Sequence, residues 1–310
     1  MKKITILLMI LGLVFGSAVI GFAAGGQESE EEGGYTLGIA MSTLANPYFL
    51  LQAETGEKKA LELGIDKESL FVLDAQDDVT KQVHQVEDLI NRGVDAIILN
   101  PVDSDAVGSV VMDANRAKIP VVTLTRPSHG GDVLQHVDTD NMSGARMAGE
   151  MVAKAMNYKG QVIELTGIPG APSTRDRAGG FEEIIANYPD IKIVAKQTAN
   201  YNRQQGLEVT ENLLEGYPDV DAIFAHNDEM ALGVLAALKA ANRTDIMIFG
   251  FDGASEVIEA IDRGEIDGTI VQQPTVQVET AVETAIKYIT EGVEPEKEII
   301  LCPCVPYPED

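Results

Sequence analysis

Polar and aromatic side chains follow the short apolar runs of this 310-residue sequence, where each run ends. Their amide, carboxylate, guanidinium and hydroxyl groups match vicinal hydroxyls, which both donate and accept hydrogen bonds. The aromatic rings among them could cover the C–H faces of a sugar ring or a carbon chain. The pattern therefore indicates a binding site for a polyhydroxylated molecule. The candidate residues are Ser42, Asn46, Tyr48, Phe49, Asn100, Thr125, Arg126, Arg177, Tyr201, Asn227, Asp252 and Gln272.

Each of these residues also admits an ordinary structural role. Asn46-Pro47 is typical of a turn with proline at the first helical position. Asp228 and Asp252 could be helix caps, because Asp is a preferred residue at that position. The arginines could be surface charges. Their shared position favours binding, because ligands of open α/β sheets lie beyond the carboxyl ends of the strands.

The sequence does not indicate catalysis. The four histidines, His84, His129, His136 and His226, have no His or Cys at metal-ligand spacing, and no H-E-x-x-H motif occurs. A G-x-S-x-G elbow, a phosphate-binding loop and a G-x-G-x-x-G fingerprint are also absent from the sequence. We therefore expect no enzyme activity, no metal site and no cofactor.

Charge and cysteine content exclude further classes of protein. The 23 Lys and Arg against 49 Asp and Glu give a net charge of −26, whereas nucleic-acid binders need a basic surface. The same charge disfavours anionic lipid as a partner. Cys302 and Cys304 would close a strained ring as a disulfide and are too few for a zinc cage, so we expect ordinary thiols.

The N-terminal segment has the pattern of a secretory signal peptide. Lys2 and Lys3 precede an apolar run from residue 4 to residue 22, and small residues follow it. We assign residues 1–24 to the signal peptide and residues 25–34 to a disordered acidic leader, which places the rest of the chain outside the cytoplasm. An uncleaved membrane anchor is the alternative, because the run approaches the length that spans a bilayer.

The remaining sequence alternates between strand and helix patterns, which predicts parallel sheets with helices on both faces. The predicted strands are Leu37–Met41, Leu70–Leu73, Ala96–Leu99, Val121–Leu124, Val162–Leu165, Ile191–Ala195, Ala222–Ala225 and Ile246–Phe249. The predicted helices are Pro47–Leu63, Val79–Arg92, Ala106–Ala117, Ser143–Met156, Phe181–Asn187, Gln204–Leu214, Glu229–Ala240 and Val257–Asp262. Such units could close one barrel or form two open sheets. The strand-like Val133–Val137, which leads into a fresh helix, favours two doubly wound domains.

Five spaced motifs carry a family resemblance. They are Ser42–Phe49 (STLANPYF), Asn100–Val107 (NPVDSDAV), Arg175–Arg177 (RDR), Asn227–Gly233 (NDEMALG) and Gly250–Gly253 (GFDG). In this order they resemble the type I periplasmic sugar-binding proteins of ABC importers, and most closely the ribose-binding ones, from Tyr35 to about Glu298. The resemblance implies two Rossmann-like lobes joined by three hinge crossings near 139–141, 272–274 and 300–303. The first lobe would comprise residues 35–138 and 274–300, and the second residues 139–273 and 301–310.

The resemblance also implies roles for the candidate residues. Aromatic positions that sandwich the sugar correspond to Tyr48, Phe49 and Tyr201, and the arginines that hold its oxygens correspond to Arg126 and Arg177. The remaining candidates correspond to hydrogen-bonding positions, with Ser42 at the mouth. Thr125 stands where the ribose-binding pattern has Asp, and Tyr48 and Tyr201 stand where it has Phe. These departures can change which hydroxyl pattern is accepted.

The expected function is capture of a monosaccharide, ribose or another pentose or hexose, and its delivery to the permease of an ABC importer by a periplasmic monomer. Two alternatives stay open: a polyol-binding protein of the same fold, and a periplasmic sensor that presents sugar to a chemoreceptor or histidine kinase. A repressor-like regulator with this core would need a DNA-binding segment, whereas this chain begins with a signal sequence.

Overall fold

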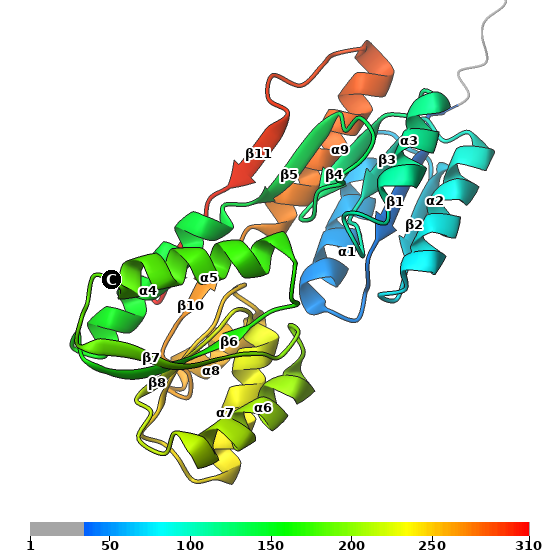
Figure 1. Ribbon diagram of the computed structural model, residues 1–310. Helices are drawn as coiled ribbons and strands as arrows, with labels where there is room; N and C mark the ends of the chain where they lie inside the picture. The colour runs from blue at the N-terminus through cyan, green and yellow to red at the C-terminus, as the bar shows by residue number, and fades with distance from the viewer. Residues whose placement is uncertain (1–33, 310) are drawn as a thin grey trace, which may run out of the picture. The chain divides into compact units, whose positions relative to one another are not determined.

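The computed structural model describes residues 34–309, which form two parallel β-sheets flanked by helices (Figure 1). The predicted signal peptide, and the predicted leader apart from Gly34, lie outside the described residues. Among residues 34–309, no helix has both the length and the apolar character needed to cross a membrane.

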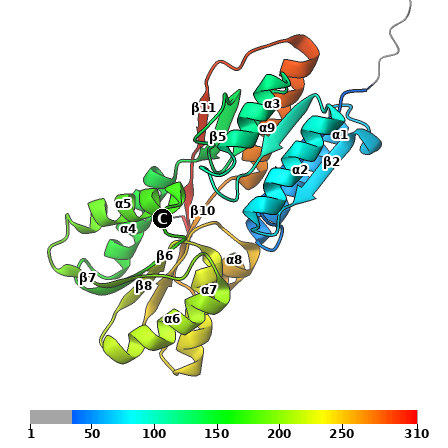
Figure 2. The ribbon, with the colours of Figure 1, turned by 45° about the vertical axis from the view of Figure 1, so that its right-hand side comes forward.

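The larger sheet has six strands, all paired in parallel, in the order β11-β5-β4-β3-β1-β2. They are β1 (Leu37–Met41), β2 (Leu70–Asp74), β3 (Ala96–Leu99), β4 (Val121–Leu124), β5 (Gln135–Thr139) and β11 (Ile299–Cys302), and the short η1 (Lys67–Ser69) precedes β2. Helices α1 (Pro47–Glu62) and α9 (Pro274–Glu291) pack on one face, and α2 (Val79–Arg92) and α3 (Gly108–Arg116) on the other (Figure 2). Because helices cover both faces, β1 and β3 are apolar throughout and fully buried. We call this half the first lobe.

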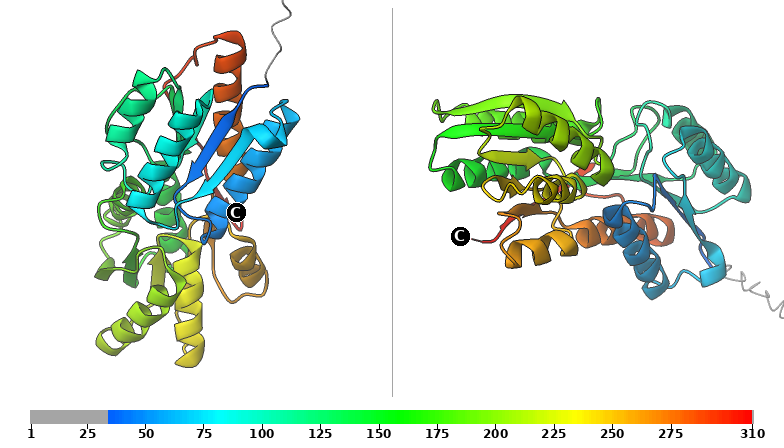
Figure 3. Two further views of the ribbon diagram at one scale, coloured as in Figure 1. Left: turned by 90° about the vertical axis from the view of Figure 1, so that its right-hand side faces the viewer. Right: turned by 90° about the horizontal axis from the view of Figure 1, so that it is seen from below.

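The smaller sheet has four parallel strands in the order β7-β6-β8-β9. They are β6 (Gly160–Thr166), β7 (Ile191–Thr198), β8 (Ala222–Ala225) and β9 (Met247–Phe249). Helices α4 (Asn141–Ala155) and α5 (Pro172–Ile185) share one apolar core with this sheet, and α6 (Arg203–Gly216), α7 (Asp228–Ala240) and α8 (Ser255–Asp262) share another (Figure 3). An antiparallel pair, β10 (Thr269–Val271) and β12 (Val305–Tyr307), completes this second lobe.

The chain passes between the lobes at three points: from β5 to α4, from β10 to α9, and from β11 to β12. The third passage lies between Cys302 and Val305, slightly later than the sequence predicts. Cys302 packs in the core of the first lobe and Cys304 in the core of the second, and both are free thiols. The exact residue boundaries of the lobes stay a prediction.

Two open sheets, rather than one closed barrel, confirm the predicted fold class. The prediction lacks α9, β10, β11 and β12. One predicted helix also starts at the wrong residue, because α5 begins at Pro172 and not at Phe181. Residues 175–177 therefore lie within a helix and not in a loop after a strand. The polar first turn of this helix, Pro172-Ser173-Thr174-Arg175, carries no apolar residue to mark helical periodicity.

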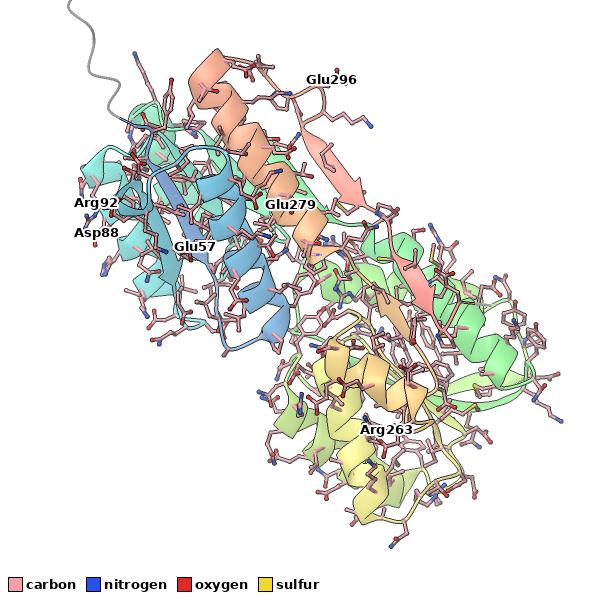
Figure 4. The ribbon with its side chains drawn as sticks, turned by 180° about the vertical axis from the view of Figure 1, so that it is seen from behind. Glu57, Asp88, Arg92, Arg263, Glu279 and Glu296 are labelled. Atoms are coloured by element: carbon pink, nitrogen blue, oxygen red, sulfur yellow. The ribbon has the colours of Figure 1, made fainter. Side chains whose placement is uncertain are left out.

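Charged side chains lie on the outside of both lobes. Asp88 and Arg92 on α2, Arg263 after α8, and Glu296 before β11 are exposed (Figure 4). The buried polar residues gather instead near the ends of the strands, where the candidate site lies.

Candidate ligand-binding site

A cavity of about 450 Å³ opens between loops of the two lobes. Nearly every lining segment follows the carboxyl end of a strand, where open α/β sheets bind their ligands. The lining residues are Thr43, Ala45, Asn46, Tyr48, Phe49, Asp77, Thr125, Arg126, Ile168, Ser173, Arg177, Asn200, Tyr201, Asn202, Arg203, Gln204, Asn227, Glu229, Asp252 and Gln272.

Ten of the twelve candidate residues line this cavity, and Ser42 and Asn100 do not. Both are fully buried. The Asn100 amide accepts from Ser42 N at 3.3 Å and donates to Leu124 O at 2.8 Å, so it joins the ends of β1 and β4 behind the cavity. Ser42 Oγ has no hydrogen-bond partner among the described residues.

Three aromatic side chains line the cavity from both lobes. Tyr48 and Phe49 come from the first turn of α1, with ring centroids 5.5 Å apart in an edge arrangement. Tyr201 comes from the loop after β7, where its hydroxyl pairs with Ser173 at 3.0 Å and Thr174 at 2.9 Å. This aromatic set can cover apolar faces of a sugar from two sides.

Both predicted arginines lie in the cavity wall, where backbone oxygens hold them. Arg126 Nη1 donates to the carbonyls of Pro101 at 2.9 Å and Val102 at 3.3 Å, and its guanidinium lies 5.3 Å from the Phe49 ring centre. Burial lowers the pKa of Arg126, which remains a cation because a guanidinium titrates far above neutral pH. It therefore supplies a fixed positive charge from the first lobe.

Arg177 is 5% exposed and donates in three directions. Its Nε bonds to Asn141 Oδ1 at 2.9 Å, and its Nη1 bonds to His226 O at 2.5 Å and contacts Asp252 Oδ1 at 3.4 Å. The guanidinium also lies 3.9 Å from the Phe251 ring centre. These contacts fix the planar group, so that its orientation toward a ligand is set before binding.

Asp252 carries the carboxylate that the sequence predicts as a ligand acceptor. Its Oδ1 accepts from Gln272 Nε2 at 2.5 Å as well as from Arg177 at 3.4 Å. Burial raises the pKa of Asp252 to about 7, although the neighbouring Arg177 opposes this shift. A carboxylate has about four lone-pair sites on its two oxygens, so Asp252 can accept hydroxyl donors from a ligand in addition to these contacts.

Two asparagines of the site are also helix caps. Asn46 Oδ1 accepts from Tyr48 N at 2.9 Å at the start of α1, and Asn227 Oδ1 accepts from Met230 N at 3.0 Å at the start of α7. The ordinary role therefore holds for both residues, while each also lines the cavity. The amide NH₂ group of each cap is the part that stays free for a ligand or a neighbouring carbonyl.

Tyr48 and Thr125, which the resemblance marks as departures, belong to a buried polar network. Tyr48 donates to Gln277 Oε1 at 2.7 Å and lies 3.2 Å from Gln272 Oε1. Thr125, at a left-handed φ of 65°, accepts from Gln52 Nε2 at 3.1 Å, and Gln52 also bonds to Gln277 at 3.0 Å. The hydroxyl of Tyr48, which Phe would lack, therefore has its hydrogen-bond partners within the protein.

Several lining residues were not among the sequence candidates. Asp77 comes from a left-handed loop after β2, and Asn202, Arg203 and Gln204 come from the start of α6. Arg203 makes paired bonds to Glu229 at 2.9 Å and Glu256 at 2.7 Å. The sequence signal for this edge is the polar run Asn202-Arg203-Gln204, which follows shortly after the end of β7. Across residues 34–309 no group of three or more His, Cys, Asp or Glu side chains could hold a metal ion.

Residues 37–292 match the family model of the periplasmic binding protein domain. The chain belongs to this family. Among its relatives, the ribose import binding protein of Haemophilus influenzae is 41% identical over 299 residues, which cover 96% of this chain and 97% of the relative. The D-apiose import binding protein of Paraburkholderia graminis is 37% identical and covers 83% of this chain and 82% of the relative.

A solved structure agrees with the family assignment. The periplasmic solute binding protein of an ABC transporter from Actinobacillus succinogenes, with bound D-allose, has a TM-score of 0.82 and 34% identity. The match covers 88% of this chain and 97% of that protein. Periplasmic binding protein membership therefore confirms the resemblance drawn from the five motifs, and the two lobes are those of the family fold.

Proposed function

We propose that this protein captures a monosaccharide between its two lobes outside the cytoplasm and delivers it to the permease of an ABC importer. The single observation that carries the proposal is the cavity wall, where Arg126, Arg177 and Asp252 supply fixed polar groups between Tyr48, Phe49 and Tyr201. The names of the relatives support it, since ribose, D-apiose and D-allose are all monosaccharides.

The proposed mechanism is hinge closure, which is a general property of periplasmic binding proteins. A ligand favours the closed form only to the extent that it contacts both lobes, and lining residues come from both. The role is binding without chemistry, because these groups match hydroxyls and none forms a nucleophile–base pair.

The proposal is tested by titrating the protein, without residues 1–24, with ribose, apiose, allose, other pentoses and hexoses, and myo-inositol. We expect one monosaccharide to bind with a Kd on the order of micromolar, about −8 kcal/mol. At about 100 times its Kd it should stabilise the protein by about 2.7 kcal/mol, which a thermal-shift assay detects.

Matched variants then locate the site. Asp252→Asn keeps the shape and removes the charge, and should weaken binding by about 10- to 100-fold, since hydrogen bonds to charged groups contribute about 1.5–3 kcal/mol. Asp219→Asn removes an exposed carboxylate outside the cavity and should leave Kd unchanged. The proposal is wrong if no sugar binds, and the site is wrong if Asp252→Asn binds as tightly as the parent.

A further inference from the structure

Asp228 is a buried carboxylate that the proposed binding mechanism does not use. It is fully buried at the first position of α7, next to the Asn227 cap. Its Oδ2 accepts from Gly253 N at 2.8 Å and Ala254 N at 2.7 Å, and its Oδ1 accepts from Thr269 Oγ1 at 2.7 Å. Asp228 therefore holds the backbone of the loop that follows Asp252, and it does not cap α7.

The loop that Asp228 holds has an unusual backbone. Asp252 has a φ of 142° and Gly253 a φ of 84°, both in the region that favours glycine. A non-glycine residue in such a conformation persists only where its surroundings enforce it. Here the neighbouring N–H groups at 253 and 254 are bound to one carboxylate, and Gln272 N bonds to Asp252 O at 2.9 Å.

The packing around Asp228 leaves it little freedom. A Cβ added at Gly250 would lie 2.2 Å from Asp228 Oδ1, so the side chain occupies the space that Gly250 leaves open. The carboxylate is thereby tied to β10 through Thr269 and to the loop after β9 through the two amides. Each of these segments leads directly to a residue of the cavity wall, Gln272 or Asp252.

We infer that Asp228 is a positioning residue, which fixes the strained loop at 252–254 so that Asp252 presents its carboxylate to the ligand. The inference rests on the proposed function, because it assigns Asp228 a part in sugar affinity. Asp228 does not line the cavity, so its effect on binding must pass through the segments that it holds, which lead to Asp252 and Gln272.

The first test uses Asp228→Asn, which keeps the size of the side chain but places an NH₂ group or a weaker acceptor against two N–H donors. Asp267→Asn is the matched control, since Asp267 Oδ2 accepts from a backbone amide, Ile248 N, at 2.8 Å in the same lobe but outside the cavity. We expect Asp228→Asn to raise Kd for the sugar by about tenfold or more, measured where both variants are fully folded, and Asp267→Asn to leave it unchanged. Equal Kd values for Asp228→Asn and the parent overturn the inference.

A second variant covers the case in which Asp228→Asn does not fold. Thr269→Val is close in shape and removes one donor to Asp228 while both loop amides keep their acceptor. It should raise Kd by about twofold to tenfold. A Thr269→Val protein with the parent Kd, together with an unfolded Asp228→Asn, shows that Asp228 serves stability alone and overturns the inference.

A pH profile separates positioning from stability. The charged or titratable groups that act on Asp252 are Arg177 from α5, Asp228 from α7, Tyr48 from α1 and Cys304 between β11 and β12. The negative charge of Asp228 raises the pKa of Asp252, so Asp228→Asn should move the acid limb of sugar binding to lower pH. An acid limb at the same pH in Asp228→Asn and in the parent contradicts the inference.

A measurement without ligand keeps this inference separate from the proposed function. Amide hydrogen exchange at Gly253 and Ala254 reports directly on the loop. In the sugar-free protein we expect Asp228→Asn to lose protection at these two amides by about tenfold or more, and Asp267→Asn to lose none there. If the parent binds no sugar, the proposed function fails, while retained protection in Asp228→Asn overturns the positioning role itself.

Discussion

At the scale of single residues, the position of Tyr201 in the cavity wall depends on the lack of a side chain at Gly167. A Cβ added at Gly167 would lie 1.9 Å from Tyr201 Cζ, so the ring fills the space beside the chain after β6. Tyr201 itself has a left-handed φ of 57°, and its hydroxyl is tied to the first turn of α5. The Tyr201 side chain is therefore fixed by packing against its ring, by the conformation of its backbone and by hydrogen bonds at its hydroxyl.

Gly167→Ala should displace this ring and weaken sugar binding by about tenfold, because an overpacked site forces a shift that costs about 1–3 kcal/mol. Titration with the sugar identified for the parent measures the effect. In a double-mutant cycle, Gly167→Ala should have little further effect on Kd once Tyr201→Ala has removed the ring. Fully additive losses would show that Gly167 does not act through Tyr201.

Residue types and their positions after strands predict only part of the site. Most candidate residues that directly follow a strand lie in the cavity wall, because strand ends of parallel sheets meet at one edge. Asn100 shares this position, yet its amide lies behind the cavity and bridges β1 and β4. The direction of a side chain at the end of a strand depends on which neighbouring strand offers a partner, and a single sequence does not contain that pairing.

At the scale of elements, two glycines let α6 and α7 approach closely. A Cβ at Gly233 on α7 would lie 2.2 Å from Arg203 O, and one at Gly206 on α6 would lie 2.8 Å from Met230 O. The contact therefore brings backbone against backbone. It also sets the position of the α6 start, which lines the cavity with Asn202, Arg203 and Gln204.

Gly233→Ala should lower the free energy of unfolding by about 1–3 kcal/mol, since backbone cannot yield as a flexible side chain can. Urea denaturation of the sugar-free protein measures it. Gly216→Ala, near the end of α6 with no atom within 4 Å of the added Cβ, is the matched control and should be neutral or stabilising. A Gly233→Ala protein as stable as this control would contradict the close approach.

Most elements with an apolar period were predicted, but α9 was not, although its buried residues Val278, Val282 and Ile286 recur at helical spacing. The eight predicted strands match β1–β4 and β6–β9, because buried parallel strands are short runs of apolar residues. The start of α5 is polar, and β12 contains Pro306 and exposed residues, so neither carries a hydrophobic pattern. Pairing with a distant segment, β10, forms β12, and local sequence does not encode such a pairing.

At the scale of the whole molecule, two features lower the stability of the fold as pH rises. The net charge of −26 repels itself in the compact state at neutral and higher pH. Glu164 on β6 is fully buried, with Oε1 at 2.8 Å from His226 Nε2. Burial raises the pKa of Glu164 to about 8, although Lys196 opposes the shift.

The direction of this pH dependence follows from the number of protons that the folded and the unfolded chain bind. In the unfolded chain a Glu carboxyl titrates at about 4.3, so above that pH the folded protein holds a proton that the unfolded chain releases. The contribution of Glu164 to stability is therefore lost as pH rises toward about 8. Burial also lowers the pKa of His226, whose contribution is present at high pH and is lost below about 6.5.

Glu164→Gln keeps a donor for His226 and removes the titrating group. Between about pH 6.5 and about pH 8, the thermal midpoint of the parent should fall relative to that of Glu164→Gln, as scanning calorimetry at several pH values can measure. Glu215→Gln, at an exposed site on α6, removes the same charge and should run parallel to the parent. Parallel curves for all three proteins would show that Glu164 is ionised when folded.

The last strands of the chain, β11 and β12, complete one sheet in each lobe. A chain that is synthesised from its N-terminus therefore has neither the β11 edge of the six-stranded sheet nor a partner for β10 until residues 299–307 are made. Because β11 and β12 lie only a few residues apart in the sequence, the two lobes complete their strand pairing at the same stage of synthesis.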